Sequence, residues 1–291
     1  MRDAGRTGVA VGFFDGVHVA HRELLSQAAA AFTFRNHPLT VLAPDRAPSL
    51  ILSAADRLAR LRGCGLDEVV AVDFTRELAD TAPEEFAASL LVLAAKFTPV
   101  GVPRVLCGPN WRFGRGGVGD AALLRRLGAE VVEVPFVEYR GEAISSTRIR
   151  EAVERGEMED AAAMLGRPFE AGGEVFRGKG EGQRLGFPTV NVRPDAASGA
   201  ERRVMPPRGV YAVDFGSVRA VANYGVAPTW GGAAWKEPVW ELHVVDGAAA
   251  MPGPNERVSF ALRRFIRPER EFASAEELCE QIEKDCKEAV K

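Results

Sequence analysis

The chain has 291 residues, of which 46% are hydrophobic and 26% are charged. This composition excludes a mainly disordered chain, and at about 150 residues per domain the length predicts two domains. The 37 Lys and Arg against 40 Asp and Glu give a formal net charge of -3, so we expect no nucleic-acid partner. The longest hydrophobic runs, such as 87–95, fall far short of the roughly 20 residues that span a membrane, so we expect no membrane insertion.

The N-terminus and the cysteines indicate a cytoplasmic protein. The opening residues, MRDAGRTG, lack the hydrophobic core of a signal peptide. The cysteines contain no C-x-x-C pair and lie far apart or at helical spacing, at Cys64, Cys107, Cys279 and Cys286. This pattern predicts reduced thiols rather than disulfides or a zinc site.

Strand-like and helix-like segments alternate in the first half. The predicted strands are 9–14, 31–35, 69–74, 104–107 and 131–135. The predicted helices are 21–31, a helix from a Ser53 cap to Gly63, 81–96 with a capping box over 81–84, and 120–127. Strands separated by helices predict a parallel sheet, whose ligands bind at the carboxyl ends of the strands.

The pattern changes in the second half. Two short helices are predicted within 145–165, and after them strands at 209–215, 219–223, 239–245 and 258–264 predict an antiparallel barrel or sandwich. A final helix is predicted from a capping box at 274–277, with one hydrophobic stripe of Leu278, Ile282, Cys286 and Val290. We therefore predict domains at 1–167 and 168–291.

Several segments that follow predicted strands carry residues suited to anions. The segment 12–21, GFFDGVHVAH, places His18 and His21 three residues apart at a helix start, where unpaired backbone N–H groups attract anions. His37 follows the second strand, and 144–150, ISSTRIR, opens a helix with three hydroxyls and two cations. Together these features favour a triphosphate site, although H-x-x-H alone is equally compatible with a structural or surface role. A G-x-G-x-x-G pattern at 114–119 does not directly follow a strand, so we expect no dinucleotide fold from it.

The densest motif of the second half is 178–191, GKGEGQRLGFPTVN. Its glycines allow a ligand to approach the backbone closely, but it lacks the G-K-[ST] of a Walker loop, and a flexible hairpin tip is the structural alternative. On the predicted strand 239–245, alternation places Glu241 and His243 on the face opposite Trp240 and Leu242. A lone glutamate on a strand is usually solvated, and we expect His243 to be structural.

These motifs occur in the order found in bacterial bifunctional riboflavin kinase/FAD synthetases, and the chain resembles that family over residues 9–284. The resemblance rests on G-x-F-D-G-V-H-x-x-H, the H-P pair, N-W-R-F-G, I-S-S-T-R-I-R and P-T-V-N, with further matches at 209–211, 223–229 and 267–269. It implies an α/β fold with an N-terminal parallel-sheet nucleotidylyltransferase domain and a C-terminal antiparallel β-barrel flavokinase domain with a terminal helix. It also implies that ATP phosphorylates riboflavin to FMN and adenylylates FMN to FAD, with release of pyrophosphate and with Mg²⁺ as cofactor.

The resemblance also implies roles for individual residues. Glu241 is implied to be the base of the kinase step, and His18 and His21 are implied to contact ATP phosphates in the adenylyl transfer. Substrate or nucleotide binding is implied for a larger set: Gly12, Phe14, Asp15, Gly16, His37, Asn110, Ser145, Ser146, Thr147, Arg148, Gly178, Gly180, Gly186, Pro188, Asn191 and Arg267. Thr189 and Asn191 are implied to contact Mg²⁺.

Elementary chemistry agrees with this division of roles. The 5′-hydroxyl of riboflavin barely ionises at neutral pH, so a carboxylate within hydrogen-bond reach would help it attack the γ-phosphorus of ATP. The phosphate of FMN is already anionic, so its attack needs cations and N–H donors rather than a base. A histidine with a pKa of about 6.5 can gain charge when phosphates approach.

The first half departs from the family pattern at Phe13 (usually Asn), Ala20 (usually Gly) and Asn36 (usually Pro). If the backbone at Ala20 required a positive φ, its Cβ would cost about 1 kcal/mol or more, whereas in a helix the cost would be slight. Two alternatives are a riboflavin kinase with a degenerate adenylyltransferase domain and a non-catalytic protein that binds flavin nucleotides. No oligomeric state is predicted.

Overall fold

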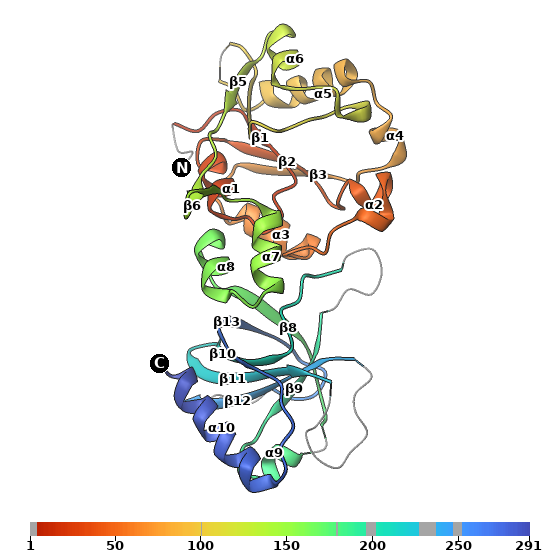
Figure 1. The fold of residues 1–291 in the computed structure, drawn as a ribbon. Helices are drawn as coiled ribbons and strands as arrows, with labels where there is room; N and C mark the ends of the chain where they lie inside the picture. The colour runs from red at the N-terminus through yellow and green to blue at the C-terminus, as the bar shows by residue number, and fades with distance from the viewer. Residues whose placement is uncertain (1–4, 100, 179, 196–201, 227–236, 247–251) are drawn as a thin grey trace. The chain divides into compact units, whose positions relative to one another are not determined.

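The fold is seen in a computed structural model, which describes residues 5–99, 101–178, 180–195, 202–226, 237–246 and 252–291 (Figure 1). The chain forms two units, Met1–Arg148 together with Ser198–Arg203, and Ile149–Ala197 together with Val204–Lys291. The predicted parallel sheet, antiparallel barrel and terminal helix are confirmed. The domain boundary after residue 167 stays a prediction.

The first unit is built on a five-stranded parallel sheet with the strand order β3-β2-β1-β4-β5. Its strands are β1 (Val9–Val11), β2 (Ala30–Phe34), β3 (Glu68–Val72), β4 (Arg104–Cys107) and β5 (Glu130–Glu133). Its helices are α1 (Val19–Leu25), α2 (Leu39–Leu42), α3 (Ala54–Arg62), α4 (Arg76–Ala79), α5 (Pro83–Ala95) and α6 (Ala121–Arg126), with 3₁₀ turns at Pro44–Arg46 and Arg115–Gly117. A small hairpin of β6 (Glu138–Tyr139) and β7 (Glu142–Ala143) follows. Because β2, β1 and β4 are neighbours, the loops that carry the predicted anion-binding residues leave the sheet at one edge.

Helices cover both faces of this sheet. Val9 and Val11 of β1 share a buried hydrophobic cluster with Leu90 of α5. On the opposite face, Thr33 of β2 accepts a hydrogen bond from Arg57 of α3. Figure 1 accordingly shows α5 and α6 on one side of the sheet and α1 and α3 on the other. This two-sided cover is typical of parallel sheets.

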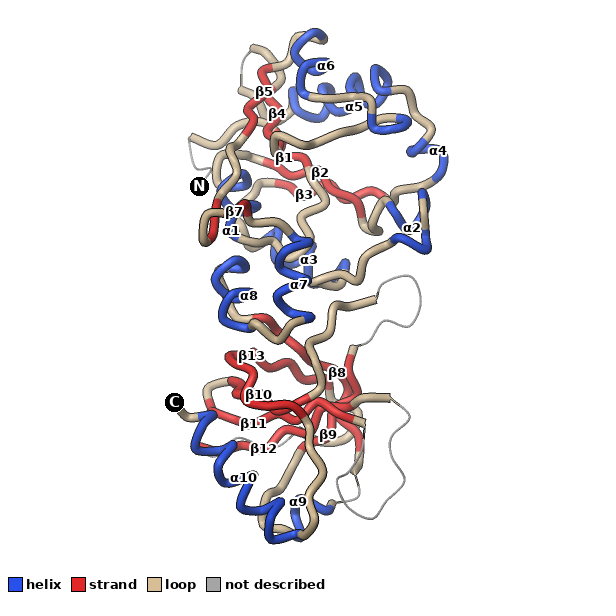
Figure 2. Tube along the Cα trace, in the orientation of Figure 1, coloured by secondary structure: helices blue, strands red, loops and turns tan. Residues whose placement is uncertain are grey.

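The second unit is a closed antiparallel barrel with the strand order β10-β11-β12-β9-β8-β13. Its strands are β8 (Phe169–Phe176), β9 (Val190–Pro194), β10 (Gly209–Phe215), β11 (Val218–Gly225), β12 (Val239–Asp246) and β13 (Arg257–Pro268). Helices α7 (Ser146–Glu154) and α8 (Met158–Leu165) precede the barrel, and α9 (Glu181–Arg184) and α10 (Ala275–Ala289) belong to it. Figure 2 shows α10 lying along the outside of the strands.

An ion pair fixes α10 to the barrel. Arg267 of β13 donates from Nε and Nη2 to the carboxylate of Asp285 on α10, with the shortest distance at 2.7 Å, and Gln281 donates to the same carboxylate. Asp285 is only 2% exposed, and a buried charge of this kind is stable only while it is paired. The guanidinium of Arg267 is therefore engaged by the helix, and its predicted contact with nucleotide stays a prediction.

The first predicted helix ends earlier than expected. The prediction of 21–31 is wrong, because α1 ends at Leu25 and Ala30 already belongs to β2. Ala30 and Ala31 are fully buried and pair with Val9 and Ala10 of β1. Pairing within the sheet thus overrides the high helix propensity of alanine.

Two helix details also differ from the prediction. The capping box at the start of α5 is wrong: Thr81 donates to the backbone oxygen of Glu77 at the end of α4, and Ala82 is the N-cap. At the start of α10 half of the predicted box is formed: Ser274 accepts from the backbone N–H of Glu277, whereas the carboxylate of Glu277 accepts from the backbone N–H of Ala273. On α10 the deepest residues are Asp285 and Ala289 rather than the expected stripe. Asp285 forms the ion pair with Arg267, and Ala289 belongs to a hydrophobic cluster with Val210 and Ala212, against which Cys286 of the stripe packs.

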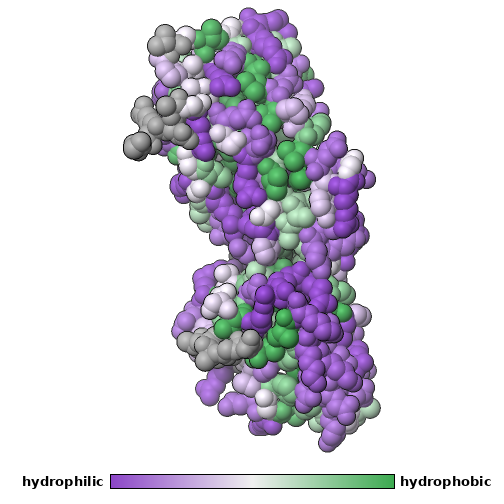
Figure 3. Space-filling view, turned by 90° about the vertical axis from the view of Figure 1, so that its left-hand side faces the viewer, coloured by the Kyte–Doolittle hydropathy of each residue, from purple (hydrophilic) through white to green (hydrophobic). Residues whose placement is uncertain are grey.

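The visible surface is mainly hydrophilic. Figure 3 shows hydrophobic residues in separate patches among hydrophilic ones. Within the described parts of the chain, every helix is too short or too polar to cross a lipid bilayer.

Candidate functional sites

The loop between β1 and α1 has a backbone conformation that few side chains adopt. Phe14 (φ 59°) and Val17 (φ 42°) join Gly16 (φ 84°) in the left-handed region. This region is costly for non-glycine residues, above all for a β-branched valine. Gly12 packs closely under the ring of Phe14, since a Cβ on Gly12 would lie 3.0 Å from it. After this turn, His18 lies at the N-cap position of α1.

Asp15 holds this loop from within. Its carboxylate is 2% exposed and accepts from the backbone N–H groups of Ile51 at 3.0 Å and Leu52 at 3.2 Å. Its backbone oxygen accepts from the hydroxyl of Ser146 at 2.9 Å. Asp15 and Ser146 were both predicted as nucleotide ligands; here they position the loop, and contact with nucleotide stays a prediction.

His18 and His21 lie face to face at the start of α1. Their rings stack with centroids 3.5 Å apart, and Nδ1 of His18 accepts from the backbone N–H of His21. Among the described residues, the buried Nδ1 of His21 has no hydrogen-bond partner. Burial, and then the positive charges of His18 and Arg57, hold the pKa of His21 well below its usual 6.5. An anion bound beside this imidazole would raise its pKa and so favour the protonated form, compared with the same ring without the anion.

The depressed pKa of His21 predicts a pH-dependent stability. The unfolded chain binds a proton at His21 near pH 6.5, whereas the folded protein resists it. The stability contribution is therefore fully present above pH 6.5 and is lost as the pH falls toward the folded-state pKa. Denaturant melts between about pH 7.5 and about pH 5.5 should show a decreasing free energy of unfolding, and His21→Asn should reduce that slope. Identical slopes in the two proteins would contradict this assignment.

His37 lies beside the same loop at the carboxyl end of β2. Its ring meets that of Phe13 edge-on with centroids 4.7 Å apart, and its Nδ1 accepts from the backbone N–H of Leu39 at 3.1 Å. We call His18, His21, His37 and the start of α7 the histidine site. Asn110 is exposed in the turn after β4, at the same edge of the sheet.

The start of α7 is held by its own hydrogen bonds. The hydroxyl of Ser145 accepts from the backbone N–H of Arg148, and Thr147 is exposed. Arg148 donates to the backbone oxygens of Tyr139 and Glu142 in the β6–β7 hairpin. Ser146 also contacts the loop after β1, through its hydrogen bond to the backbone oxygen of Asp15. Nucleotide binding by residues 145–148 stays a prediction.

Arg57 is a buried residue of this region that the sequence analysis missed. It is fully buried, lies 4.1 Å from the ring centroid of Phe13, and donates to the backbone oxygens of Phe13 and Phe34. It thereby joins the loops that follow β1 and β2. The sequence did contain one sign that Arg57 is buried: it lies four residues before Leu61, on the side of α3 that faces the interior.

The departures from the family pattern fit their surroundings. Ala20 lies inside α1 with a helical backbone, so its Cβ costs little. The side-chain amide of Asn36 accepts from the backbone N–H of Phe74 at 2.8 Å and donates to its oxygen at 3.0 Å. Phe13 fills the space between Arg57 and His37.

In the barrel, Glu241 lies in a cross-strand row with two asparagines. On β12 it is opposite Asn191 of β9 on one side and Asn223 of β11 on the other. Directly paired residues share one face of a sheet, and all three are half-buried. Trp240 and Leu242, before and after Glu241, are buried inside the barrel, which confirms the predicted alternation. The row places a carboxylate between two amides.

A second carboxylate extends this row. Glu269 hydrogen-bonds Asn223, and its oxygens lie so close to Gly225 that any Cβ there would collide with them. Burial raises the pKa of Glu269, against the opposing effects of Asn223, Arg208 and Arg267. Glu269 lies in the segment 267–269 that matches the family, and no role was predicted for it.

The glycine-rich segment 178–186 packs against the residues predicted to hold a metal. A Cβ on Gly178 would collide with the amide of Asn191, and one on Gly182 would lie 3.1 Å from the hydroxyl of Thr189. We call Thr189, Asn191, Asn223 and Glu241 the barrel site. Only glycine lets the backbone approach these side chains so closely.

The rest of the segment is only partly described. Gly180 (φ 73°) and Gly186 (φ 85°) adopt left-handed conformations, and Pro188 follows in an exposed position. Lys179 and the side chain of Glu181 lie outside the described residues, as do residues 227–229 of the predicted match at 223–229. Among the described residues, no group of three His, Cys, Asp or Glu side chains is arranged to hold a metal ion.

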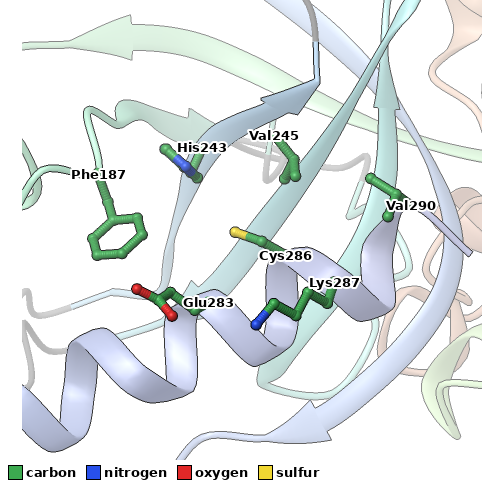
Figure 4. A pocket seen from close by; sticks show the side chains of 7 residues that line it. All are labelled: Phe187, His243, Val245, Glu283, Cys286, Lys287 and Val290. Atoms are coloured by element: carbon green, nitrogen blue, oxygen red, sulfur yellow. The ribbon is translucent and has the colours of Figure 1, made fainter.

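A pocket of about 340 Å³ lies between β12 and α10 (Figure 4). It is lined by Phe187, His243, Val245, Glu283, Cys286, Lys287 and Val290. The rings of Phe187 and His243 meet edge-on at 5.4 Å, and Nδ1 of His243 donates to the backbone oxygen of Pro188 at 2.9 Å. Because His243 is two residues after Glu241, the pocket opens on the face of β12 that carries the barrel site. Its volume is that of a small-molecule site.

Known proteins match both halves of the chain. A family model described as FAD synthetase matches residues 1–148, and one described as riboflavin kinase matches residues 165–291. A bifunctional riboflavin kinase/FMN adenylyltransferase of Escherichia coli (strain K12) is 34% identical over 94% of this chain and 89% of that protein. A protein of the same name from Bacillus subtilis is 29% identical over 99% and 93% of the two chains. A solved structure described as a macrolide-efflux protein from Streptococcus pneumoniae has a TM-score of 0.80 at 28% identity and covers 98% of this chain and 94% of that one.

Proposed function

Because this chain belongs to the family of bifunctional riboflavin kinase/FMN adenylyltransferases, we propose that its two sites divide the two reactions. The barrel site phosphorylates riboflavin to FMN, and the histidine site transfers the adenylyl group of ATP to FMN. The observation that carries the kinase assignment is the row in which Glu241 pairs with Asn191 and Asn223, next to a pocket of ligand size.

In the kinase step, Glu241 accepts the proton of the riboflavin 5′-hydroxyl. The new bond joins this oxygen to the γ-phosphorus of ATP, and the bond to the β-phosphate oxygen breaks, which releases ADP. The pocket beside α10 supplies an apolar wall of Phe187, Val245 and Cys286 for the flavin ring. Burial raises the pKa of the Cys286 thiol to about 11, so it stays protonated and serves as part of this wall rather than as a nucleophile.

Thr189 and Asn191 fit the Mg²⁺ that phosphoryl transfer uses. The side chains of Thr189 and Asn191 both offer neutral oxygen atoms. The backbone at Gly178 lies close to Asn191, and the backbone at Gly182 lies close to Thr189. Mg²⁺ commonly binds through few protein oxygens together with substrate phosphates. When bound, it would neutralise charge on the phosphates, and the negative ligands would come from ATP.

In the adenylyl transfer, an oxygen of the FMN phosphate attacks the α-phosphorus of ATP and pyrophosphate leaves. The attacking group is already anionic, so the site has to supply positive charge and N–H donors. His18 and His21 lie stacked at the start of α1, and an approaching phosphate favours the protonated form of the His21 ring, which then supplies positive charge. We assign the cytoplasm as the site of action, in keeping with four cysteines that are all free thiols.

Product analysis tests the proposal. Purified protein incubated with riboflavin, ATP and Mg²⁺ should yield FMN and then FAD on a chromatogram of the flavins. FMN as the sole product would favour a kinase with a degenerate first domain. Absence of both products, with retained flavin binding, would favour a non-catalytic binding protein and contradict the proposal.

A further inference from the structure

The loop that carries the histidine site needs support from outside. Phe14 and Val17 hold positive φ angles that their side chains disfavour. Such conformations persist only where surrounding contacts fix them, and they concentrate at functional sites. Contacts that fix this loop therefore also fix where His18 and His21 point.

One support of the loop comes from the backbone N–H groups of Ile51 and Leu52. Asp15 accepts from the N–H of Ile51 and from the N–H of Leu52. Leu50, Ile51 and Leu52 are all at most 5% exposed, so these hydrogen bonds are shielded from water. The position of Asp15 thus follows the position of the backbone at 50–52.

That backbone is itself held by a distant part of the chain. Arg203 donates from Nη2 to the backbone oxygen of Ile51 at 2.8 Å, and its Nη1 lies 3.6 Å from the carboxylate of Asp56. The N–H of Leu50 donates to the backbone oxygen of Arg202 at 2.6 Å, in a parallel bridge between Leu50 and Arg203. Asp15 therefore holds the N–H of Ile51, and Arg203 holds its oxygen.

Arg203 comes from the stretch that matches riboflavin kinase, yet it belongs to the first unit. We propose that Arg203 is a positioning residue for the adenylyl transfer, acting through Ile51 and Asp15 on the loop that presents His18 and His21. The side chain is 15% exposed and reaches no part of the barrel site in its described contacts. This inference rests on the proposed function, because it assigns adenylyl transfer to the histidine site.

The expected effect falls on one activity of the chain. With FMN supplied, Arg203→Ala should lower kcat for FAD formation about 10-fold and leave the KM values for ATP and FMN within about twofold, because a displaced loop weakens contacts made in the transition state. FMN formation from riboflavin should be unchanged in the same preparation, which reports that the barrel is folded, and unchanged KM values for ATP and FMN report that the first unit is folded. Arg203→Lys should recover part of kcat, since an ammonium can still donate to the oxygen of Ile51.

Arg202→Ala is the matched control. It removes the same charge at the adjacent position, where the side chain is exposed and only the backbone oxygen contacts Leu50. The inference is overturned if Arg203→Ala behaves like Arg202→Ala, if both activities fall together, or if the loss lies in KM alone. An unmodified enzyme that makes no FAD would instead overturn the proposed function, and the inference with it.

Discussion

Glu241→Gln should lower the rate of FMN formation about 10³-fold, while FMN supplied to the same protein is still converted to FAD. The amide keeps the size of the side chain and its place between Asn191 and Asn223, but it cannot accept the proton of the riboflavin hydroxyl. The measurement is the initial rate of each half-reaction, started from riboflavin or from FMN.

Glu271→Gln is a suitable control for this variant. Glu271 is exposed just after β13, so the substitution makes the same change of charge outside the barrel site. It should leave both rates unchanged. A Glu241→Gln protein that phosphorylates riboflavin at the normal rate would show that the carboxylate is not the base.

His21→Ala should have the opposite selectivity. We expect FAD formation to fall about 10³-fold, because the stacked pair loses a ring that can take up charge beside the leaving pyrophosphate. FMN formation from riboflavin should stay normal, since the barrel site contains no part of α1. Separate rates for the two half-reactions again provide the measurement.

The control for His21→Ala lies on the same helix. Glu23→Ala changes an exposed residue of α1 whose described partner is Gln27, and it should leave both activities intact. If His21→Ala and Glu241→Gln each abolished both activities in folded protein, the assignment of one reaction to each site would be wrong.

Much of the fold follows from local patterns. The alternation of strands and helices in the first half predicted the parallel sheet, and the short strands of the second half predicted an antiparallel barrel or sandwich. The family resemblance implied the barrel. Strands β8 and β9 were not predicted, and in β8 the adjacent Gly172 and Gly173 look like turn residues. In the structure a Cβ on Gly173 would collide with the backbone oxygen of Arg193, so these glycines serve the close approach of two strands.

The candidate sites were predictable only where a motif is continuous in sequence. Such motifs predicted His18, His21 and Asn191 as candidates, whereas Glu241 was implied only by the family resemblance. Arg57, Glu269 and Arg203 act across long sequence separations, and no local pattern reports which backbone oxygen or amide a buried side chain will reach. Arg267 shows the converse, since a residue singled out by its motif is bound to Asp285 on the terminal helix.

The ring of strands also has a consequence for synthesis of the protein. Strand β8 begins at Phe169, but one of its two neighbours is β13, which starts only at Arg257. A nascent barrel on the ribosome therefore keeps β8 half-paired until nearly the whole polypeptide has been translated, and such long-range pairing forms slowly. Chaperones that shield an unpaired strand would be most valuable to this protein late in its translation.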